Sequence, residues 1–588
     1  MLEACLEIFE RQPDIDKLIL DTYVPVEGTY VIMAYESGQF VQKEWIEVKK
    51  DKKSGEALLT YREREAISRP DYYCKLISTD KAIDYPKKII LSNSYLGFII
   101  KQENLMNGNL TKEIITKYYT VLRNPRIRYT KKKDRALYDA VEKQIGPVNC
   151  QNVDLIEQWI NENIFQLADK VTGKNYLKIF FQMDHADYEI EGKRYYVPKI
   201  FNKNLYNEKL LDEWYGVSDN NMGFNSDKPY LVHKNRKCQF TNMENLDKVM
   251  RKKKFFDYLM NLASERRYNV YLPIDPGKKI TACKDDDEYG IPDGFTGYKL
   301  RTMIDNTEAA IIDVDYVIDY RDLLDRSFYM QNLVEVPEKY LEDVEYGEIS
   351  KRSIVRKLVD EVFFSKYYLK NIYTEPKDMK GIKDSGIRKG LLLYRDAYAE
   401  WLNKGNDAAN LIYVVKQSGD MLIHNTIENN YMIKAMHQFN LKWSLLEYFQ
   451  ESEGTMKNKL TTIRQKLKRK MDADVLQDIE SDEEYSYAAG QMLGYLIGLN
   501  KSSKKTFSLG NRYLALNKDA QLKEQLRQLF MRYDHDEDMY KYKKRVGNLL
   551  AMIMAYDVEL AIDHDLMLAG YVSNGVIFEK KQGEKADE

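Results

Sequence analysis

The side chains with the clearest chemical potential are two His-Asp dipeptides near the end of the chain. They are His535-Asp536 and His564-Asp565, flanked by Asp534, Asp538 and Asp563. Imidazole and carboxylate groups bind divalent metal ions when a fold brings them together. A metal-dependent nuclease is therefore one hypothesis. Against it, His535 falls in the expected loop between two helices, where polar residues are common.

Basic side chains gather in three clusters. Cluster 123–135 contains Arg123, Arg126, Arg128, Lys131, Lys132, Lys133 and Arg135; cluster 251–254 contains Arg251, Lys252, Lys253 and Lys254; cluster 457–470 contains Lys457, Lys459, Arg464, Lys466, Lys468, Arg469 and Lys470. Binding to nucleic-acid phosphates requires such local density of positive charge. A solvated helix face is the slightly better explanation of any one cluster, and the presence of three clusters in one chain shifts the balance modestly towards contacts with phosphates.

A segment rich in asparagine and glycine spans residues 216–230. Its polar side chains, with the basic ones that follow, are Asn220, Asn221, Asn225, Lys228, Lys234 and Arg236. Asparagine pairs with base edges in the grooves of duplex DNA, and glycine lets a backbone approach a phosphate closely. Taken alone, this composition is more typical of a turn.

Several common catalytic signatures are missing from the sequence. It contains no GxxxxGK[ST], no GxGxxG after a strand and no GxSxG. Its five cysteines are far apart and form no CxxC pair, which argues against a disulfide framework and against a zinc ribbon. We expect no cofactor.

The composition limits the class of protein. The 588 residues include 90 Lys and Arg against 92 Asp and Glu, a formal charge of −2, which excludes a uniformly cationic nucleic-acid binder. The first residues do not resemble a signal peptide. No apolar run approaches the roughly 18 residues of a membrane helix. We expect a cytoplasmic protein with no membrane association.

The elements that would position these side chains change type along the chain. Segments rich in β-branched and aromatic residues predict strands at 29–34, 88–100, 177–183, 269–274 and 309–318. Apolar residues at helical spacing predict helices at 134–145 and 245–265. These features predict an α+β region over residues 1–345.

The remainder of the chain is expected to be helical. Apolar residues recur at helical spacing from about residue 346, and Pro376 is the last proline. We expect a helical connecting region over 346–455. Residues 456–588 carry four amphipathic segments joined by short polar ones, which describes a helical bundle. The predicted fold class is an α+β N-terminal region followed by an all-α C-terminal region ending in that bundle.

Three parts of the chain carry a resemblance to a known family. They are DYYCKLISTDKAIDYPKKIILSNSYLGFIIKQENL (71–105), YGVSDNNMGFNSDKPYL (215–231) and the ending YAAGQMLGYLIG…LALNKDAQLKEQLRQLF…VELAIDHDLMLAGYVSNG. These segments resemble the large subunit of the type I-B CRISPR Cascade complex, the Cas-eight-b or Csh-type family. The similarity runs in order from about Glu27 to the C-terminus. Its motifs are structural signatures rather than catalytic ones.

The resemblance implies a non-catalytic subunit of a surveillance complex. Such a subunit sits at the 5′-handle end of the guide crRNA, recognises the protospacer-adjacent motif (PAM) in target double-stranded DNA and promotes R-loop formation. The implied partners are the Cascade backbone subunits, the 5′-handle-binding subunit, a small subunit and a separate helicase–nuclease effector. Residues 1–345 would form the domain for PAM recognition and the guide end, and residues 456–588 would resemble the small subunit.

This family role suggests a place for each candidate. Asn220, Asn221 and Asn225 would meet base edges of the PAM, with Lys228, Lys234 and Arg236 on adjacent phosphates. Clusters 123–135 and 251–254 would contact guide RNA or target duplex. Lys466, Lys468, Arg469 and Lys470 would track the displaced single strand. Some relatives carry cysteine pairs suited to zinc, which this sequence lacks, so we expect no metal ion.

Two further interpretations stay open. Members of the family also produce a separate small subunit from an internal start codon, for which Met456 and Met471 are the candidates. Outside the family, the main alternative is the metal-dependent nuclease with its HD-type cluster. A third interpretation is a structural scaffold that never contacts DNA.

Overall fold

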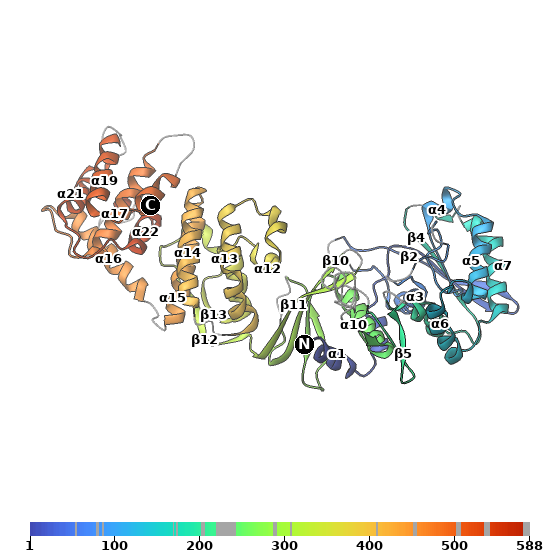
Figure 1. The fold of residues 1–588 in the computed structure, drawn as a ribbon. Helices are drawn as coiled ribbons and strands as arrows, with labels where there is room; N and C mark the ends of the chain where they lie inside the picture. Colours follow the sequence, from blue (N-terminus) through green and yellow to red (C-terminus); the bar gives the residue numbers. More distant parts are fainter. Residues whose placement is uncertain are drawn as a thin grey trace, which may run out of the picture. The chain divides into compact units, whose positions relative to one another are not determined.

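The computed structural model describes residues 1–52, 56–77, 81–84, 87–167, 170–171, 174–201, 206–218, 243–285, 291–305, 308–406, 410–450, 455–500, 507–533 and 541–579. The chain forms two compact units (Figure 1). The first unit is Met1–Asp285 with Thr296–Val317, and the second is Asp286–Phe295 with Ile318–Glu588. Helices and sheets alternate in the first unit, and helices dominate the second, which confirms the predicted fold class. The predicted boundary near residue 345 falls inside the second unit.

The first unit is built on a four-stranded sheet in the order β2-β1-β4-β3. Its strands are β1 (Gly28–Glu36), β2 (Gln39–Val48), β3 (Gly97–Lys101) and β4 (Tyr176–Gln182). β1 pairs antiparallel with β2 and parallel with β4, and β3 pairs antiparallel with β4. β1 and β4 are buried along most of their length, as expected of central strands rich in apolar residues.

A buried ion pair joins this sheet to a helix. Lys178 of β4 places Nζ 2.6 Å and 2.8 Å from the two carboxylate oxygens of Asp71. Tyr23 and Tyr30 donate their hydroxyls to the same carboxylate, at 2.9 Å and 3.1 Å. Burial lowers the pKa of Lys178, although the adjacent Asp71 opposes that shift. The carboxylate of Asp71 thus accepts from three different side chains inside the core.

Nine described helices belong to the first unit. They are α1 (Leu2–Glu10), α2 (Ile15–Asp21), α3 (Tyr61–Cys74), α4 (Gln102–Met106), α5 (Lys112–Arg123), α6 (Lys132–Ile145), α7 (Cys150–Leu167), α8 (Tyr188–Tyr196) and α10 (Leu246–Ser264). The helices predicted at 134–145 and 245–265 are confirmed as α6 and α10. A second sheet has the order β11-β10-β8-β9. Its strands are β8 (Asn269–Pro273), β9 (Thr281–Cys283), β10 (Phe295–Asp305) and β11 (Glu308–Tyr320).

The second unit opens with a strand pair and continues as helices. The pair is β12 (Leu323–Met330) and β13 (Gly347–Lys351). The helices are α11 (Arg352–Val362), α12 (Tyr368–Asn371), α13 (Ser385–Lys404), α14 (Leu411–Glu428), α15 (Met432–Gln450), α16 (Thr455–Asp472), α17 (Asp482–Gly498), α18 (Asn511–Leu514), α19 (Asp519–Tyr533), α21 (Lys543–Ala555) and α22 (His564–Val572). The four amphipathic segments of the predicted bundle correspond to α16, α17, α19 and α21.

Helix α15 is buried although it carries many polar side chains. Some of these side chains hold an extended segment that follows β12. Asn440 Oδ1 accepts from the backbone N–H groups of Leu333 and Val334, at 3.0 Å and 3.1 Å. Ser444 Oγ accepts from the N–H of Gln331 at 2.9 Å. A helix side chain thus supplies the hydrogen bonds that a neighbouring strand would otherwise provide.

Other polar groups of α15 fix the neighbouring helices. The ammonium of Lys442 is completely buried and bonds to Asp420 of α14 and Asp565 of α22. These two carboxylates raise the pKa of Lys442 despite its burial, which lowers it. Glu447 Oε1 accepts from the N–H of Met456 at 2.7 Å, at the start of α16. Every polar group named here has a partner on a different element.

The C-terminal bundle does not close its core alone. Ile423 and Ile427 of α14 and Phe439 of α15 belong to the same buried cluster as the apolar faces of α16, α17, α19, α21 and α22. The buried stripe of α16 includes Leu460 and Leu467. The predicted boundary at 455/456 therefore separates helices that share one core. No helix in the described part of the chain is long and apolar enough to cross a membrane.

Two glycines let α17 and α22 pack backbone against backbone. A Cβ atom on Gly490 would lie 2.1 Å from the carbonyl oxygen of Met567, and one on Gly570 would lie 2.3 Å from that of Tyr487. Both contacts are with backbone, which cannot move away as a flexible side chain would. The close approach of these helices therefore requires glycine at both positions.

We expect Gly490→Ala to destabilise the protein by about 2–3 kcal/mol, because the added methyl group must push α17 away from α22. The midpoint of thermal unfolding, followed by circular dichroism, measures this effect. Gly547→Ala is the matched control, since Gly547 lies in α21 with nothing within 4 Å of the added atom. The control should be neutral or stabilising by up to about 1 kcal/mol. Equal midpoints for the two variants would contradict the requirement for glycine at 490.

Candidate nucleic-acid interface

A small sheet joins the chain on either side of residues 219–242. β5 (Glu208–Leu210), β6 (Glu213–Gly216) and β7 (Glu244–Asn245) pair antiparallel. Tyr215 pairs with Asn245 and Gly216 with Glu244, so the chain entering residues 219–242 lies beside the chain leaving them. The candidates within the segment lie outside the described residues: Asn220, Asn221, Asn225, Lys228, Lys234 and Arg236.

The buried carboxylate of Glu244 anchors this small sheet. It accepts from the hydroxyl of Ser218 and from the ammonium of Lys252, and Lys248 Nζ lies 3.3 Å away. Burial raises the pKa of Glu244, but the bonds from Lys252 and Ser218 outweigh burial and hold the pKa below its ordinary value. Asn245 caps α10 by accepting from the N–H of Lys248 at 3.0 Å. The chain that precedes residue 219, the chain that follows residue 242 and α10 are thereby joined.

Cluster 251–254 is largely committed to contacts inside the first unit. Lys252 has no exposed side-chain surface and belongs to Glu244. The other three pair as follows: Arg251 with Glu10, Lys253 with Asp257, and Lys254 with Asp16. A phosphate cannot reach the ammonium of Lys252 in this structure, so its predicted contact with nucleic acid does not fit the geometry.

Cluster 123–135 divides into a paired part and an unpaired part. Arg123 forms ion pairs with Asp154 and Glu157, and Arg126 with Asp139 and Glu142. Arg128 donates to Asn93 and to the carbonyl of Lys81. These arginines bind α7, α6 and a loop of the same unit. Their guanidinium groups therefore already form hydrogen bonds or ion pairs within the protein.

Lys131, Lys132 and Lys133 differ from these arginines. All three are exposed, and none forms an ion pair with a carboxylate in the described ranges. They stand at the N-terminal end of α6, where the backbone already contributes positive potential. Cations are unfavourable at that end of a helix, and an approaching phosphate would relieve their repulsion. These lysines are the strongest phosphate candidates among the residues predicted from sequence.

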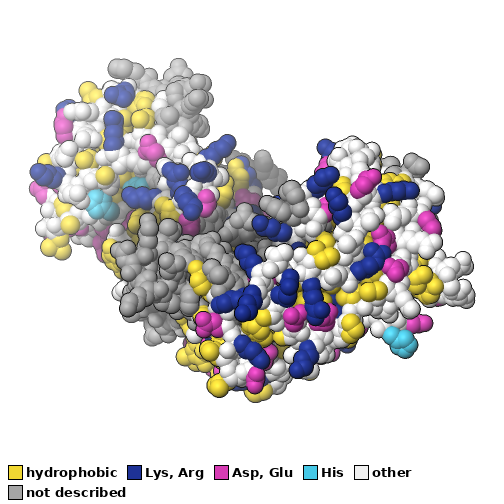
Figure 2. Space-filling view, turned by 45° about the vertical axis from the view of Figure 1, so that its right-hand side comes forward, with side chains coloured by type: hydrophobic (Ala, Val, Ile, Leu, Met, Phe, Trp, Pro, Cys, Tyr) yellow, Lys and Arg dark blue, Asp and Glu magenta, His cyan; other side chains and the backbone are white. Residues whose placement is uncertain are grey.

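Cluster 457–470 is also mostly neutralised. Lys466 pairs with Glu480, Lys468 and Arg464 pair with Glu579, and Lys459 pairs with Glu483. The ammonium of Lys470 is buried between Glu480 and Glu484. Lys457 and Arg469 are exposed, without an ion pair to a described carboxylate. On the face of the molecule drawn in Figure 2, Asp and Glu side chains lie among more frequent Lys and Arg side chains.

The described half of the HD-type cluster serves the fold. Both ring nitrogens of His564 are occupied, Nδ1 by the carbonyl of Leu514 at 2.9 Å and Nε2 by Asn517 at 2.7 Å. Asp563 caps α22, and Asp565 pairs with buried Lys442. His535, Asp534, Asp536 and Asp538 lie outside the described residues. Within the described ranges, no group of three or more His, Cys, Asp or Glu side chains could hold a metal ion.

Sequence inspection missed one basic site. Arg512 of α18 and Arg532 of α19 line a common pocket, although they are distant in sequence and belong to no basic cluster. Only the packing of the two helices brings them together.

Comparisons with protein-family models, with curated proteins and with solved structures find no match.

We expect Glu244→Gln to destabilise the protein by about 2–4 kcal/mol, because it leaves the buried charge of Lys252 without its counter-charge. Urea unfolding near neutral pH measures the loss. Glu213→Gln, an exposed change in the same small sheet, should stay within about 0.5 kcal/mol.

The pH dependence of this difference has a definite sign. A carboxyl whose pKa is depressed by folding contributes its stability above the pKa of the unfolded chain, and loses it as pH falls through the folded pKa. The gap between wild type and Glu244→Gln should therefore be full near neutral pH and shrink below the ordinary Glu pKa of 4.5. A gap that widens on acidification would contradict this role for Glu244.

We expect replacement of Lys131, Lys132 and Lys133 by Gln to weaken binding of the protein to nucleic acid and to flatten its salt dependence. The slope of log K against log salt should fall by about 2–3, since each phosphate contact with duplex DNA contributes about 0.9. The control replaces Lys357, Lys383 and Lys389, which are also exposed, and changes the net charge equally. Equal slopes for the two triple variants would place the phosphate contacts elsewhere.

Proposed function

We propose that the chain is the non-catalytic large subunit of a type I-B CRISPR Cascade complex. In this role it recognises the PAM in duplex DNA, promotes R-loop formation and supports recruitment of a helicase–nuclease. Guide pairing supplies most of the sequence specificity of such a complex, and protein contacts read only a short motif and the backbone. The protein would act in the cytoplasm with crRNA, the backbone subunits and the 5′-handle-binding subunit.

The observation that carries the proposal is the bonding between the two stretches of chain that flank residues 219–242. Side chains that bind base edges need support from rigid elements of the fold. Glu244, Ser218 and Lys252 provide such support by joining β6, β7 and α10. The exposed lysines 131–133 of the same unit offer a complementary contact to phosphates.

The segments that resemble the family also fit the proposal. Asp71 of the first segment is buried in the core of the first unit, and the glycines of the last segment create the close contact of α17 with α22. The resemblance therefore falls on residues that determine folding. This agrees with a subunit whose similarity to its family lies in structural signatures.

The nuclease alternative is less favoured by the described residues. His564 and Asp565 are both used in hydrogen bonds or ion pairs that hold α22 to its neighbours. A metal ion would have to displace these contacts. Incubation of the protein with Mn²⁺ or Mg²⁺ and DNA discriminates the two functions, because cleavage by the purified chain would support the alternative.

An internal start would give different fragments at the two candidate methionines. Met456 is the second residue of α16, so a start there keeps the whole helix. Met471 lies in the last turn of α16, and a start there removes the buried stripe formed by Leu460, Ile463 and Leu467. We therefore favour Met456 for a separate small subunit. Such a fragment would need a partner to cover the core that α14 and α15 close in the full chain.

The decisive experiment measures binding of the assembled complex to guide-matched duplexes that differ only in the flanking trinucleotide. We expect the triple variant Asn220→Ala, Asn221→Ala, Asn225→Ala to lose discrimination among these duplexes, because each bidentate contact with a base edge contributes about 1–3 kcal/mol. Salt-dependent background binding should persist, since phosphate contacts remain.

The matched control replaces Asn104, Asn107 and Asn109 by Ala, the same chemical change in another part of the first unit. Discrimination should be retained in the control. If the segment variant also retains full discrimination, the segment does not read sequence and the proposed role of its asparagines is wrong.

A further inference from the structure

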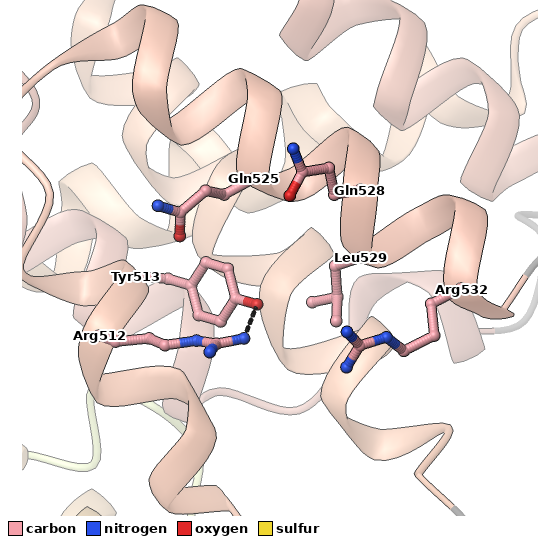
Figure 3. A pocket seen from close by; sticks show the side chains of 6 residues that line it. All are labelled: Arg512, Tyr513, Gln525, Gln528, Leu529 and Arg532. Atoms are coloured by element: carbon pink, nitrogen blue, oxygen red, sulfur yellow. Dashed lines mark hydrogen bonds between the residues drawn. The ribbon is translucent and has the colours of Figure 1, made fainter.

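The helical bundle contains a pocket of about 370 Å³. Its lining comes from α18 and α19: Arg512, Tyr513, Gln525, Gln528, Leu529 and Arg532 (Figure 3). Tyr513 and Leu529 are buried, and the other lining side chains are polar or charged. Ligand pockets commonly span about 300–1,000 Å³, so the volume of this pocket suits a small molecule.

The two arginines give the pocket its charge. Arg512 lies against the ring of Tyr513, 4.6 Å from its centroid, and donates to the Tyr513 hydroxyl at 2.5 Å. These contacts hold the guanidinium in place without neutralising it. Arg532 approaches the pocket from the other side (Figure 3). Neither arginine forms an ion pair with a carboxylate in the described part of the chain.

This lack of ion pairs distinguishes Arg512 and Arg532 from their neighbour. Arg527, on the same helix as Arg532, is held by Glu524 at 2.9 Å through two of its nitrogens. Glu524 is the acidic residue of α19 that lies nearest to Arg532 in sequence. Its carboxylate is already paired with Arg527. The acidic residues that follow Arg532, at 534–538, lie outside the described residues. Two guanidinium groups that face one pocket without a described counter-charge favour an anionic ligand.

The glutamines narrow the chemistry of that ligand. Gln528 donates Nε2 to Glu524 at 2.7 Å, so its Oε1 remains as an acceptor. An acceptor repels the oxygens of a simple anion but pairs with O–H or N–H groups. Gln525 can donate and accept. The pocket therefore suits a molecule with an anionic group at one end and hydrogen-bond donors close by.

We propose that this pocket binds a nucleotide unit, with Arg512 and Arg532 on its phosphate and the two glutamine amides on its sugar or base. A nucleotide combines both required features within the volume of the pocket. The nucleotide belongs either to a single-stranded nucleic acid or to a free mononucleotide. Both present a phosphate beside a sugar and a base. The proposal does not rest on the Cascade role, because it follows from the pocket alone.

The test uses the full-length protein and two probes, a labelled oligothymidylate and adenosine monophosphate, at fixed low salt. We expect Arg532→Gln to weaken binding of at least one probe about ten-fold, the effect of losing a charge-assisted hydrogen bond. Loss confined to the oligothymidylate assigns the pocket to single strands. Loss that includes adenosine monophosphate assigns it to free nucleotides.

Arg527→Gln is the matched control, with the same change of charge on the same helix but outside the pocket lining. It should leave binding within about two-fold, as expected of an exposed group with its own ion pair. Arg512→Gln provides a second variant, and the thermal midpoint of each protein confirms its folding. If wild type binds neither probe, or if Arg532→Gln and Arg512→Gln bind as the control does, the proposal is overturned.

Discussion

The second unit depends on satisfying the polar groups of a helix buried on almost every side. A buried polar group without a partner costs about 1–3 kcal/mol. Helix α15 carries several buried polar side chains. Each of the groups described above meets a partner on a different element: Asn440 and Ser444 on the extended segment, Lys442 on α14 and α22, Glu447 on α16. Displacing any one element would remove a hydrogen-bond or ion-pair partner from a polar group of α15. The helix therefore fixes the arrangement of the unit as well as its core.

Ion pairs within each unit also determine which cations are open to a ligand. Most arginines and lysines of the three basic clusters contact carboxylates of the same unit, so local density in the sequence overstates the available charge. A cation that already has a short ion pair gains less from a phosphate, because the new contact must replace an existing one. Among the described residues, cations without a described ion pair include the exposed lysines at the start of α6 and the two arginines of the α18–α19 pocket. Function is best sought where charge is uncompensated.

Much of the fold could be predicted from sequence, but the sites could not. Buried strands such as β1 and β4, and the stripe of α16, have strong apolar periodicity and were found. β2 was missed because its exposed, charged residues give little strand signal. Within the predicted strand 88–100, Ser92 and Ser94 form a buried turn instead, with Ser92 Oγ donating to the carbonyl of Cys74. The burial of Lys252 and the meeting of Arg512 with Arg532 depend on tertiary packing, which no local pattern records.

The contacts of α15 also impose an order on folding during synthesis of the chain. Leu333 and Asn440, which bond directly, are separated by 107 positions. A ribosome adding about 5–20 residues per second needs about 5–20 s to pass from one to the other. During that time the segment after β12 has been made but lacks its acceptors, and the apolar side chains of Leu333, Val334 and Val336 have no core to enter. This part of the second unit is thus completed only after α15 has been made. Until then the apolar segment after β12 stays open to binding by a chaperone.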